Sequence, residues 1–347
     1  MSPVLSRSLL AKLPKAELHC HLDGSVRPET LIELGRAYGK PMPLNDAEAL
    51  REFMVVRDAR NLEDYLSRFS ITLSVMQRAE ALERIAYELL EDASHDGITY
   101  IEVRYSPVLN TREGLSLGEA VESALRGIAR ATRDFGVIGR VIVCALRNLP
   151  AETSLELARL AVAYKASGVV AFDLAGGEVG NPAALHAAAF AHAREYDLAC
   201  TVHAGEGDGP ESIREAVHLC GADRIGHATR LIEDASLAQY VNDRRIALEI
   251  CLTSNVQTRA TSTYETHPLR KYFDQGQNVV LNTDNRLMSG TTLTDEYWYA
   301  AQHLDFTMRE LRTIALNGFA SAFLPWVERL ELIANAEQTF GELQTPP

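Results

Sequence analysis

The chain has 347 residues, 46% of them hydrophobic and 23% charged, which is the balance of a globular protein with a large core. Asp and Glu number 47 against 34 Lys and Arg, and the resulting net charge of −13 disfavours nucleic acid or an acidic membrane surface as a partner. The five cysteines are scattered without a C-x-x-C pair, and no apolar stretch approaches the ~18 residues of a membrane span, so we expect a cytoplasmic protein.

Eight short β-rich segments alternate with helical patterns along the chain. They are expected near 15–21, 99–105, 138–145, 168–174, 198–204, 224–228, 245–251 and 278–283. Most of the intervening segments carry apolar residues at helical spacing, and glycine often ends them, as at Gly97, Gly136 and Gly168. This alternation predicts an α/β fold, a (β/α)8 barrel of the TIM type, formed by a single domain over residues 1–347.

The interval from about 28 to 97 departs from this alternation. It contains several helical patterns, including PETLIELGRAYG and AEALERIAYELLEDASHDG, and no strand pattern. We interpret it as a helical insertion after the first strand that lies over the mouth of the barrel. Beyond Asp284 the pattern is helical again, which predicts additional C-terminal helices.

Residues of metal-binding type stand at the ends of three expected strands. His19 and His21 end the first strand, His203 ends the fifth, and Asp284 follows the eighth. Alternate residues of a strand share a face, so the first two histidines point the same way and Cys20 points to the opposite side. Barrel active sites lie at the carboxyl ends of the strands, and three imidazoles with a carboxylate suit Zn²⁺ with one position left for water. We therefore predict one zinc ion per chain.

Two further ionisable residues follow strand ends. Glu206 stands three residues after the ligand of the fifth strand, where a carboxyl group can transfer protons without binding the metal, although it can equally belong to the first turn of a helix. His227 ends the sixth strand and suits the orientation or deprotonation of a water. Glu102 and Arg104 are expected inside the barrel, and Glu249 as a partner of a ligand imidazole. The other histidines are expected in surface or core packing without specific partners: His95, His186, His192, His218, His267 and His303.

Several sequence blocks, in their order along the chain, resemble the motifs of the adenosine deaminase family. They are PKAELHCHLDGSVRPET, YIEVRYSP, FDLAGGE, TVHAGEG, RIGHATRL, LEICLTSN and LNTDN, and the similarity spans roughly residues 12–330. The resemblance implies a (β/α)8 barrel with one catalytic zinc, which agrees with the pattern of strands and ligands. The smaller zinc deaminases of nucleic-acid bases carry H-x-E and P-C-x-x-C motifs, and neither is present in this sequence.

The resemblance also implies roles for single residues. The zinc ligands are His19, His21, His203 and Asp284, and the catalytic residues are Glu206 and His227. In this assignment Glu206 donates a proton to purine N1, and His227 lies beside the water at the zinc. The implied substrate-binding residues are His21, Asp23, Gly176 and Asn285, of which Asp23 binds a ribose hydroxyl and Gly176 offers its backbone to N3. Tyr65, Leu66 and Phe69 occupy the place of a hydrophobic lid.

One position departs from the family pattern. The family commonly has a second aspartate after the metal aspartate, which contacts purine N7, and this chain has Asn285 there. An asparagine amide donates a hydrogen bond at any ordinary pH, so the change is compatible with purine binding but leaves the preferred substrate open.

We therefore expect zinc-dependent deamination of adenosine and 2′-deoxyadenosine to the inosine nucleosides. The alternatives are a sister deaminase of adenine, N6-substituted AMP or aminofutalosine, and a non-catalytic nucleoside or zinc binder on the same fold. A binuclear amidohydrolase is less compatible, because GVVAFDLAG at the fourth strand supplies no bridging lysine. The sequence leaves the oligomeric state open between a monomer and a small homo-oligomer.

Overall fold

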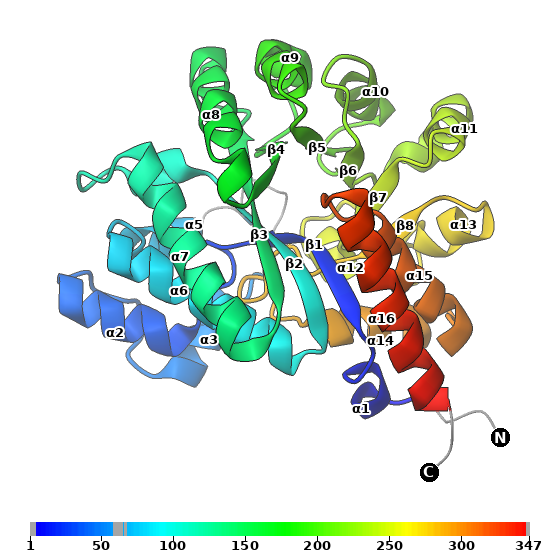
Figure 1. Ribbon diagram of the computed structural model, residues 1–347, viewed down its shortest axis with the longest axis horizontal. Coiled ribbons are helices and arrows are strands. Elements are labelled where there is room, and N and C mark those ends of the chain that lie inside the picture. Colours follow the sequence, from blue (N-terminus) through cyan, green and yellow to red (C-terminus); the bar gives the residue numbers. More distant parts are fainter. Residues whose placement is uncertain (1–4, 58–64, 66–67, 345–347) are drawn as a thin grey trace.

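The computed structural model describes residues 5–57, 65 and 68–344 of the chain, and it contains a barrel of eight parallel strands (Figure 1). Neighbouring strands pair in chain order from the first to the eighth. The strands are β1 (Lys15–His21), β2 (Ile98–Tyr105), β3 (Ile138–Leu146), β4 (Val169–Ala175), β5 (Ala199–Ala204), β6 (Arg224–His227), β7 (Ala247–Ile250) and β8 (Val279–Leu281). The predicted (β/α)8 barrel is confirmed, and each expected strand lies within a few residues of its observed position.

The barrel closes between the last strand and the first through the backbone of two predicted ligands. The amide of His21 donates to the carbonyl of Asp284 at 2.7 Å, and the amide of Asp284 donates to the carbonyl of His19 at 3.0 Å. An isolated parallel bridge joins Cys20 and Asp284 at the same point. The closure of the sheet therefore brings the predicted ligands of β1 next to the predicted ligand after β8.

Helices surround the strands in an outer ring, as Figure 1 shows. A short helix, α1 (Arg7–Leu10), precedes β1. Between β1 and β2 lie α2 (Pro28–Tyr38), α3 (Ala47–Met54), α5 (Phe69–Val75) and α6 (Ala79–His95). The helices that follow are α7 (Leu117–Phe135), α8 (Ala151–Ala163), α9 (Ala187–Glu195), α10 (Pro210–His218), α11 (Ala235–Asp243), α12 (Leu252–Gln257), α13 (Leu269–Asp274), α14 (Leu293–His303), α15 (Met308–Ala320) and α16 (Trp326–Gln344). In the part of the chain that the structure describes, no helix is both long and apolar enough to cross a membrane.

The described part of the interval between β1 and β2 contains helices and no strand, but its parts have different places. Helix α6 belongs to the outer ring, since Glu83 forms ion pairs with Arg126 and Arg130 of α7 at 3.1 and 2.9 Å. The segment before it reaches the loop after β8, where the amide of Val56 donates to the carbonyl of Met288 at 2.9 Å. The expected cover over the barrel mouth thus comes from the earlier part of the interval, and α6 is a regular barrel helix.

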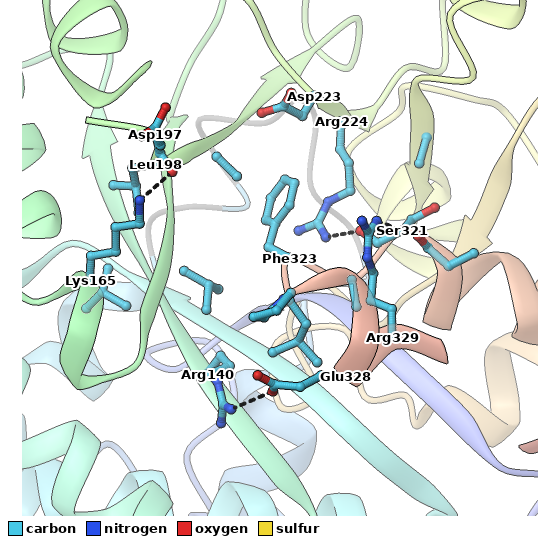
Figure 2. A pocket seen from close by; sticks show the side chains of 18 of the residues that line it. Arg140, Lys165, Asp197, Leu198, Asp223, Arg224, Ser321, Phe323, Glu328 and Arg329 are labelled. Atoms are coloured by element: carbon cyan, nitrogen blue, oxygen red, sulfur yellow. Dashed lines mark hydrogen bonds and ion pairs between the residues drawn. The ribbon is translucent and has the colours of Figure 1, made fainter. Parts of the chain in front are cut away.

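The opposite, amino-terminal end of the barrel contains a cavity of about 1310 Å³ (Figure 2). Its lining includes the first residues of β4 and β6, Val169 and Arg224, together with Lys165, Phe323 and Arg329. None of the residues predicted to bind metal or substrate lines it. The predicted metal-binding and substrate-binding residues therefore lie away from this cavity, toward the carboxyl-terminal end of the barrel.

Candidate metal centre and active site

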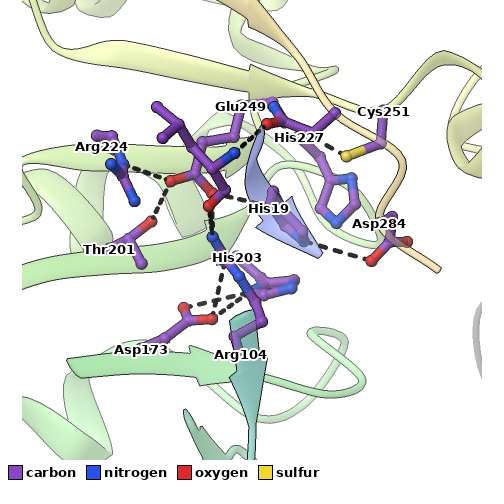
Figure 3. A network of polar contacts seen from close by, with 12 residues as sticks. His19, Arg104, Asp173, Thr201, His203, Arg224, His227, Glu249, Cys251 and Asp284 are labelled. Atoms are coloured by element: carbon purple, nitrogen blue, oxygen red, sulfur yellow. Dashed lines mark hydrogen bonds and ion pairs between the residues drawn. The ribbon is translucent and has the colours of Figure 1, made fainter. Parts of the chain in front are cut away.

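The four predicted zinc ligands converge at the carboxyl ends of the strands. One possible ligand atom from each of His19, His21, His203 and Asp284 lies within 4.8 Å of the others. We call these four residues the ligand cluster; Figure 3 shows three of them, His19, His203 and Asp284, together with the neighbouring His227. Three members are buried and His21 is half-buried, so the cluster faces the barrel mouth through this one imidazole.

Hydrogen bonds to carboxylates orient the two most buried imidazoles. The Nδ1 atom of His19 lies 2.9 Å from Oε2 of Glu249, and Nδ1 of His203 lies 3.2 Å from Oδ1 of Asp173. A carboxylate only accepts, so both imidazoles carry their proton on Nδ1 and turn a bare Nε2 toward the centre of the cluster. The expected partnership between Glu249 and a ligand imidazole is confirmed.

The atoms at the centre of the cluster fit a zinc ion. Nε2 of His21 and Nε2 of His203 face each other at 3.1 Å, and Nε2 of His19 lies 3.3 Å from Oδ1 of Asp284. Nε2 of His19 is buried and has no hydrogen-bond partner among the described residues. Burial lowers the pKa of His21 and of His203, which favours the neutral form that binds metals. Three nitrogen donors and one oxygen donor in this arrangement are a ligand set that Zn²⁺ accepts.

A set of buried charges lies beside the cluster, and we call it the inner polar layer: Glu102, Arg104, Asp173, Arg224 and Glu249. Figure 3 labels the last four of these residues. Arg104 contacts Asp173 and Glu249, each at 2.9 Å, and Arg224 contacts Glu249 at 2.6 Å and also Glu102. All five side chains are at most 1% exposed. The expectation that Glu102 and Arg104 lie inside the barrel is confirmed.

The loop after β5 holds Glu206 beside the cluster. The carboxylate of Glu178 accepts hydrogen bonds from the backbone amides of Gly205, Glu206 and Gly207 at 2.9–3.1 Å, which fixes the course of the loop. The Glu206 side chain is buried, its Oε1 accepts from the Thr258 hydroxyl at 2.9 Å, and its Oε2 lies 3.4 Å from Nε2 of His227. Glu206 therefore lies next to the cluster without being one of its members.

Two of these residues have unusual backbone conformations. The φ angle is +64° at His227 and +61° at Asp284, in the left-handed region that residues with side chains seldom adopt. His227 ends β6 and Asp284 is the third residue after β8, so both strained positions lie at the carboxyl ends of strands. Such conformations cost free energy and cluster at functional sites.

The predicted substrate-binding residues surround the same mouth. Asp23 and Asn285 are buried, and Oδ1 of each has no hydrogen-bond partner in the described chain. Burial raises the pKa of Asp23 to about 7. Gly24 makes room for Asn285, because a Cβ atom at Gly24 would lie 1.8 Å from Oδ1 of Asn285. Gly176 directly follows β4 and has a φ of +98°, a backbone conformation that favours glycine over residues with a side chain.

The proposed lid is described only in part. Tyr65 is buried, its hydroxyl lies 2.8 Å from Oγ of Ser289, and its ring is 6.3 Å from the ring of Phe69. These contacts place Tyr65 against the loop that follows Asp284. Leu66 lies outside the described residues.

Several partners at the site were not identified from the sequence. Ser254 donates to Oδ2 of Asp284 at 2.6 Å, and Asn255 lies 3.0 Å from Nδ1 of His227. His267 lies 3.1 Å from Asn255, so the expectation that His267 has no specific partner is wrong. The same correction holds for His186, whose Nδ1 lies 2.8 Å from Oγ of Ser154, and for His303, whose Nδ1 lies 2.7 Å from Oε1 of Glu265. The block LEICLTSN contains Ser254 and Asn255, but their contacts depend on how α12 turns back over the barrel.

Comparisons with known proteins identify the family of the chain. The model of the family described as "Adenosine deaminase" matches residues 14–339. An adenosine deaminase of Clostridium acetobutylicum is 40% identical over 90% of this chain and 94% of its own length. Among solved structures, an adenine deaminase from Arthrobacter aurescens superposes with a TM-score of 0.88 at 28% identity, covering 95% of this chain and 99% of that one. The Arabidopsis N6-mAMP deaminase gives a TM-score of 0.85 at 26% identity, covering 95% and 99%. The chain belongs to the adenosine deaminase family.

Proposed function

We propose that the protein is a zinc-dependent deaminase of adenosine and 2′-deoxyadenosine that releases ammonia and the corresponding inosine nucleoside. The observation that carries this proposal is the convergence of the four ligands with Glu206 and His227 beside them. It is supported by curated relatives named adenosine deaminase at 38–40% identity over at least 90% of the chain. A non-catalytic binder has no need of a buried glutamate next to the ligand cluster.

The residues divide the work of hydrolysis between them. His19, His21, His203 and Asp284 would hold the zinc ion, which when bound would lower the pKa of a water and so supply a nucleophile at neutral pH. Glu206 donates a proton to purine N1, and this protonation makes C6 more electrophilic. N1 then receives the electron pair that the attack at C6 displaces. His227, whose Nε2 lies 3.4 Å from Oε2 of Glu206, orients the attacking water. Attack forms the C6–O bond, and the C6–N bond then breaks as the hydroxyl proton of the attacking oxygen passes to the amino group, which leaves as ammonia. The aminopurine becomes the oxopurine, and general acid–base help of this kind contributes ~10²–10⁴-fold.

The charges near the mouth favour a nucleoside over a nucleotide. A phosphate group needs a cation or backbone amides that are free to bind it. Arg286, two residues after Asp284, is held by Glu17 at 3.0 Å and by Asp96 at 2.8 Å. Arg147, near Gly176, is buried and donates to two backbone carbonyls at 2.6 and 2.8 Å. Both guanidinium groups are already committed, so they offer little to a 5′-phosphate.

The second candidate is a sister deaminase of adenine or of an N6-substituted AMP, as the names of the two structural neighbours indicate. Adenosine, 2′-deoxyadenosine, adenine, AMP, N6-methyl-AMP and aminofutalosine should be compared for release of ammonia or methylamine under one set of conditions. We expect the highest kcat/KM for the two nucleosides. A higher kcat/KM for adenine or for a nucleotide would overturn the assignment, and Glu206→Gln provides the matched inactive control for each substrate.

A further inference from the structure

A chain of hydrogen bonds leads from His227 away from the ligand cluster. Nδ1 of His227 lies 3.0 Å from Nδ2 of Asn255 on α12, and Oδ1 of Asn255 lies 3.1 Å from Nε2 of His267. Nδ1 of His267 accepts a hydrogen bond from the backbone amide of Leu269 at 3.0 Å. His227, Asn255 and His267 are each at most 3% exposed, so water does not compete for these contacts.

The backbone amide at the far end determines the direction of every bond in the chain. An amide N–H can only donate, so Nδ1 of His267 carries no proton. Burial lowers the pKa of His267 to about 3, and the neutral ring must therefore carry its single proton on Nε2. Nε2–H of His267 donates to Asn255, and the atom that receives it must be the amide oxygen.

The same argument fixes the amide of Asn255. In the flipped orientation its NH₂ group would face Nε2 of His267, and that ring would then have to accept at both nitrogens, which a neutral imidazole cannot do. The NH₂ group of Asn255 therefore points at His227, whose Nδ1 must accept. His227 is left with its proton on Nε2.

This Nε2–H group faces the reaction side. Nε2 of His227 lies 3.4 Å from Oε2 of Glu206, and the His227 ring lies 4.8 Å from the ring of His19. The backbone of the same turn is held by α13, because the Tyr272 hydroxyl donates to the carbonyl of Ala228 at 3.0 Å. The segment that carries Asn255, His267 and Tyr272 thus fixes both the ring and the strained backbone of His227.

We propose that Asn255 and His267 are positioning residues that hold His227 in the Nε2–H tautomer, so that it donates a hydrogen bond to the attacking oxygen and does not remove its proton. The proposal rests on the proposed deamination, for which it assigns the role of His227. An amide group does not pass protons along such a chain, so the chain orients the imidazole and is no proton wire. Of the two roles open to His227 from the sequence, orientation or deprotonation of the water, the geometry points to the first.

The tautomer can be measured directly by ¹⁵N NMR of the full-length protein labelled on histidine, with and without zinc. We expect an unprotonated Nδ1 and a protonated Nε2 for His227, assigned by the signals that disappear in His227→Gln. His186 is an internal reference in the same spectrum, because its Nε2 faces the carbonyl of Arg147 at 3.3 Å and must donate. A protonated Nδ1 of His227 in the natural protein would overturn the proposal without any assay of activity.

Asn255→Asp keeps the shape of the side chain and removes its donor. A carboxylate can only accept, so Nδ1 of His227 should become protonated in the variant, while the signals of His186 stay unchanged. We expect kcat to fall at least tenfold with a smaller change in KM and with zinc content retained. Asn317→Asp makes the same chemical change where the amide donates to the carbonyl of Val279, and it should alter neither the His227 signals nor kcat. An unchanged His227 spectrum in Asn255→Asp would contradict the proposal.

His267 allows an independent test if Asn255→Asp does not fold. A glutamine at 267 can still donate to Oδ1 of Asn255, whereas a phenylalanine of similar volume cannot. We expect His267→Gln to keep the His227 tautomer and most of kcat, and His267→Phe to lose both. Equal behaviour of the two variants would overturn the role of His267. If the natural protein released no ammonia from any aminopurine nucleoside, the proposed function would fail. The tautomer measurements would still decide whether the hydrogen bonds through Asn255 and His267 set the tautomer of His227.

Discussion

Two neighbouring sets of buried polar residues lie inside the barrel and differ in how they compensate their charges. In the inner polar layer the guanidinium groups of Arg104 and Arg224 each contact two carboxylates, so both cations are paired within the layer, which holds three carboxylates against two guanidinium groups. In the ligand cluster two imidazole nitrogens face each other at 3.1 Å, and Nε2 of His19 has no hydrogen-bond partner within the described residues. The layer pairs both of its cations internally, whereas the cluster turns imidazole nitrogens and a carboxylate oxygen toward one another, which is the arrangement that a cation requires.

The two sets are joined by only a few hydrogen bonds. Glu249 contacts both arginines of the layer and Nδ1 of His19, and Asp173 contacts Arg104 and Nδ1 of His203. Burial opposes the ionisation of Glu249, but the charges of Arg104 and Arg224 outweigh it and hold the pKa of this carboxyl well below its usual range. The layer thus holds fixed hydrogen-bond acceptors beneath the imidazoles. We expect substitutions in the layer to change the free energy of unfolding and substitutions beside the ligand cluster to change kcat, and variants can test this difference.

Glu206→Gln should have the largest effect and should affect chemistry alone. The amide cannot deliver a proton to N1, so we expect kcat to fall ~10²–10⁴-fold while zinc content and the free energy of unfolding stay near their natural values. Glu211→Gln makes the same change on a side chain that is 77% exposed, and it should leave kcat unchanged. Steady-state kinetics with metal analysis checks both. Retention of more than about a tenth of kcat, a difference below ~1.4 kcal/mol, would remove Glu206 from the role of acid.

Glu249→Gln should affect both sets at once. It removes a charge shared by two buried guanidinium groups and one imidazole, so we expect a loss of ~3–5 kcal/mol in the free energy of unfolding. Zinc affinity should fall ~10–100-fold, because the charged carboxylate that orients His19 becomes an uncharged amide. Glu83 also bridges two arginines, but on the exposed outer face between α6 and α7, and Glu83→Gln should cost less than ~1 kcal/mol. Denaturant unfolding and competition with a chelator measure the two quantities, and equal costs for the two variants would contradict the distinction between buried and exposed networks.

Glu296 extends the comparison to a buried carboxyl without an arginine. Its Oε1 accepts from the hydroxyls of Thr253 and Thr291 at 2.5 and 2.8 Å, and burial raises its pKa from 4.5 to about 7. Because the folded-state pKa is raised, the contribution of this group to stability is full below about pH 4.5 and is lost as the pH rises through 7. Glu296→Gln removes this titration.

The test compares Glu296→Gln with the natural protein by urea unfolding of the metal-free chains at pH 5 and pH 8. The natural protein should lose more stability between these two values than the variant does, by on the order of 3 kcal/mol at most. Glu48→Gln, on a side chain that is 77% exposed, serves as the control and should leave the pH dependence unaltered. The same pH dependence in all three proteins would show that Glu296 is ionised in the folded state throughout this range.

The strands and the ligand set could be predicted from the sequence because both depend on local pattern. An apolar run ending in His19, His203 or Asp284 predicts a strand and a side chain at its carboxyl end, and the barrel brings such ends together. The partners of the ligands could not be predicted in the same way. Asn255 and His267 lie on short segments after β7, and their contacts depend on how these segments pack over His227. Similarly, the place of α6 in the outer ring follows from its packing on α7, which helical periodicity alone does not determine.

Asn285 is the position where the sequence leaves the substrate open, and it gives the smallest and most specific prediction. Its side chain lies in the space above Gly24, next to the cluster, with Oδ1 unpartnered in the described chain. If its amide donates to purine N7, then 7-deazaadenosine, which has a C–H group there, leaves that donor unpaired in a buried site. Such a loss costs ~1–3 kcal/mol, so kcat/KM should fall at least several-fold relative to adenosine.

Asn285→Asp restores the family's common residue, and its comparison with the natural protein completes the test. We expect the variant to remain active with a kcat/KM that gains a dependence on pH, because only a protonated carboxyl can donate to N7. Zinc content should not change, since Asp284 keeps its contacts with Ser254 and with His19. Equal kcat/KM for adenosine and 7-deazaadenosine in the natural protein would show that Asn285 does not contact N7. Asn285 would then act through Asp284, and a change in the zinc affinity of Asn285→Asp would reveal that role. Such a change would place Asn285 with Ser254 among the residues that orient the ligand cluster.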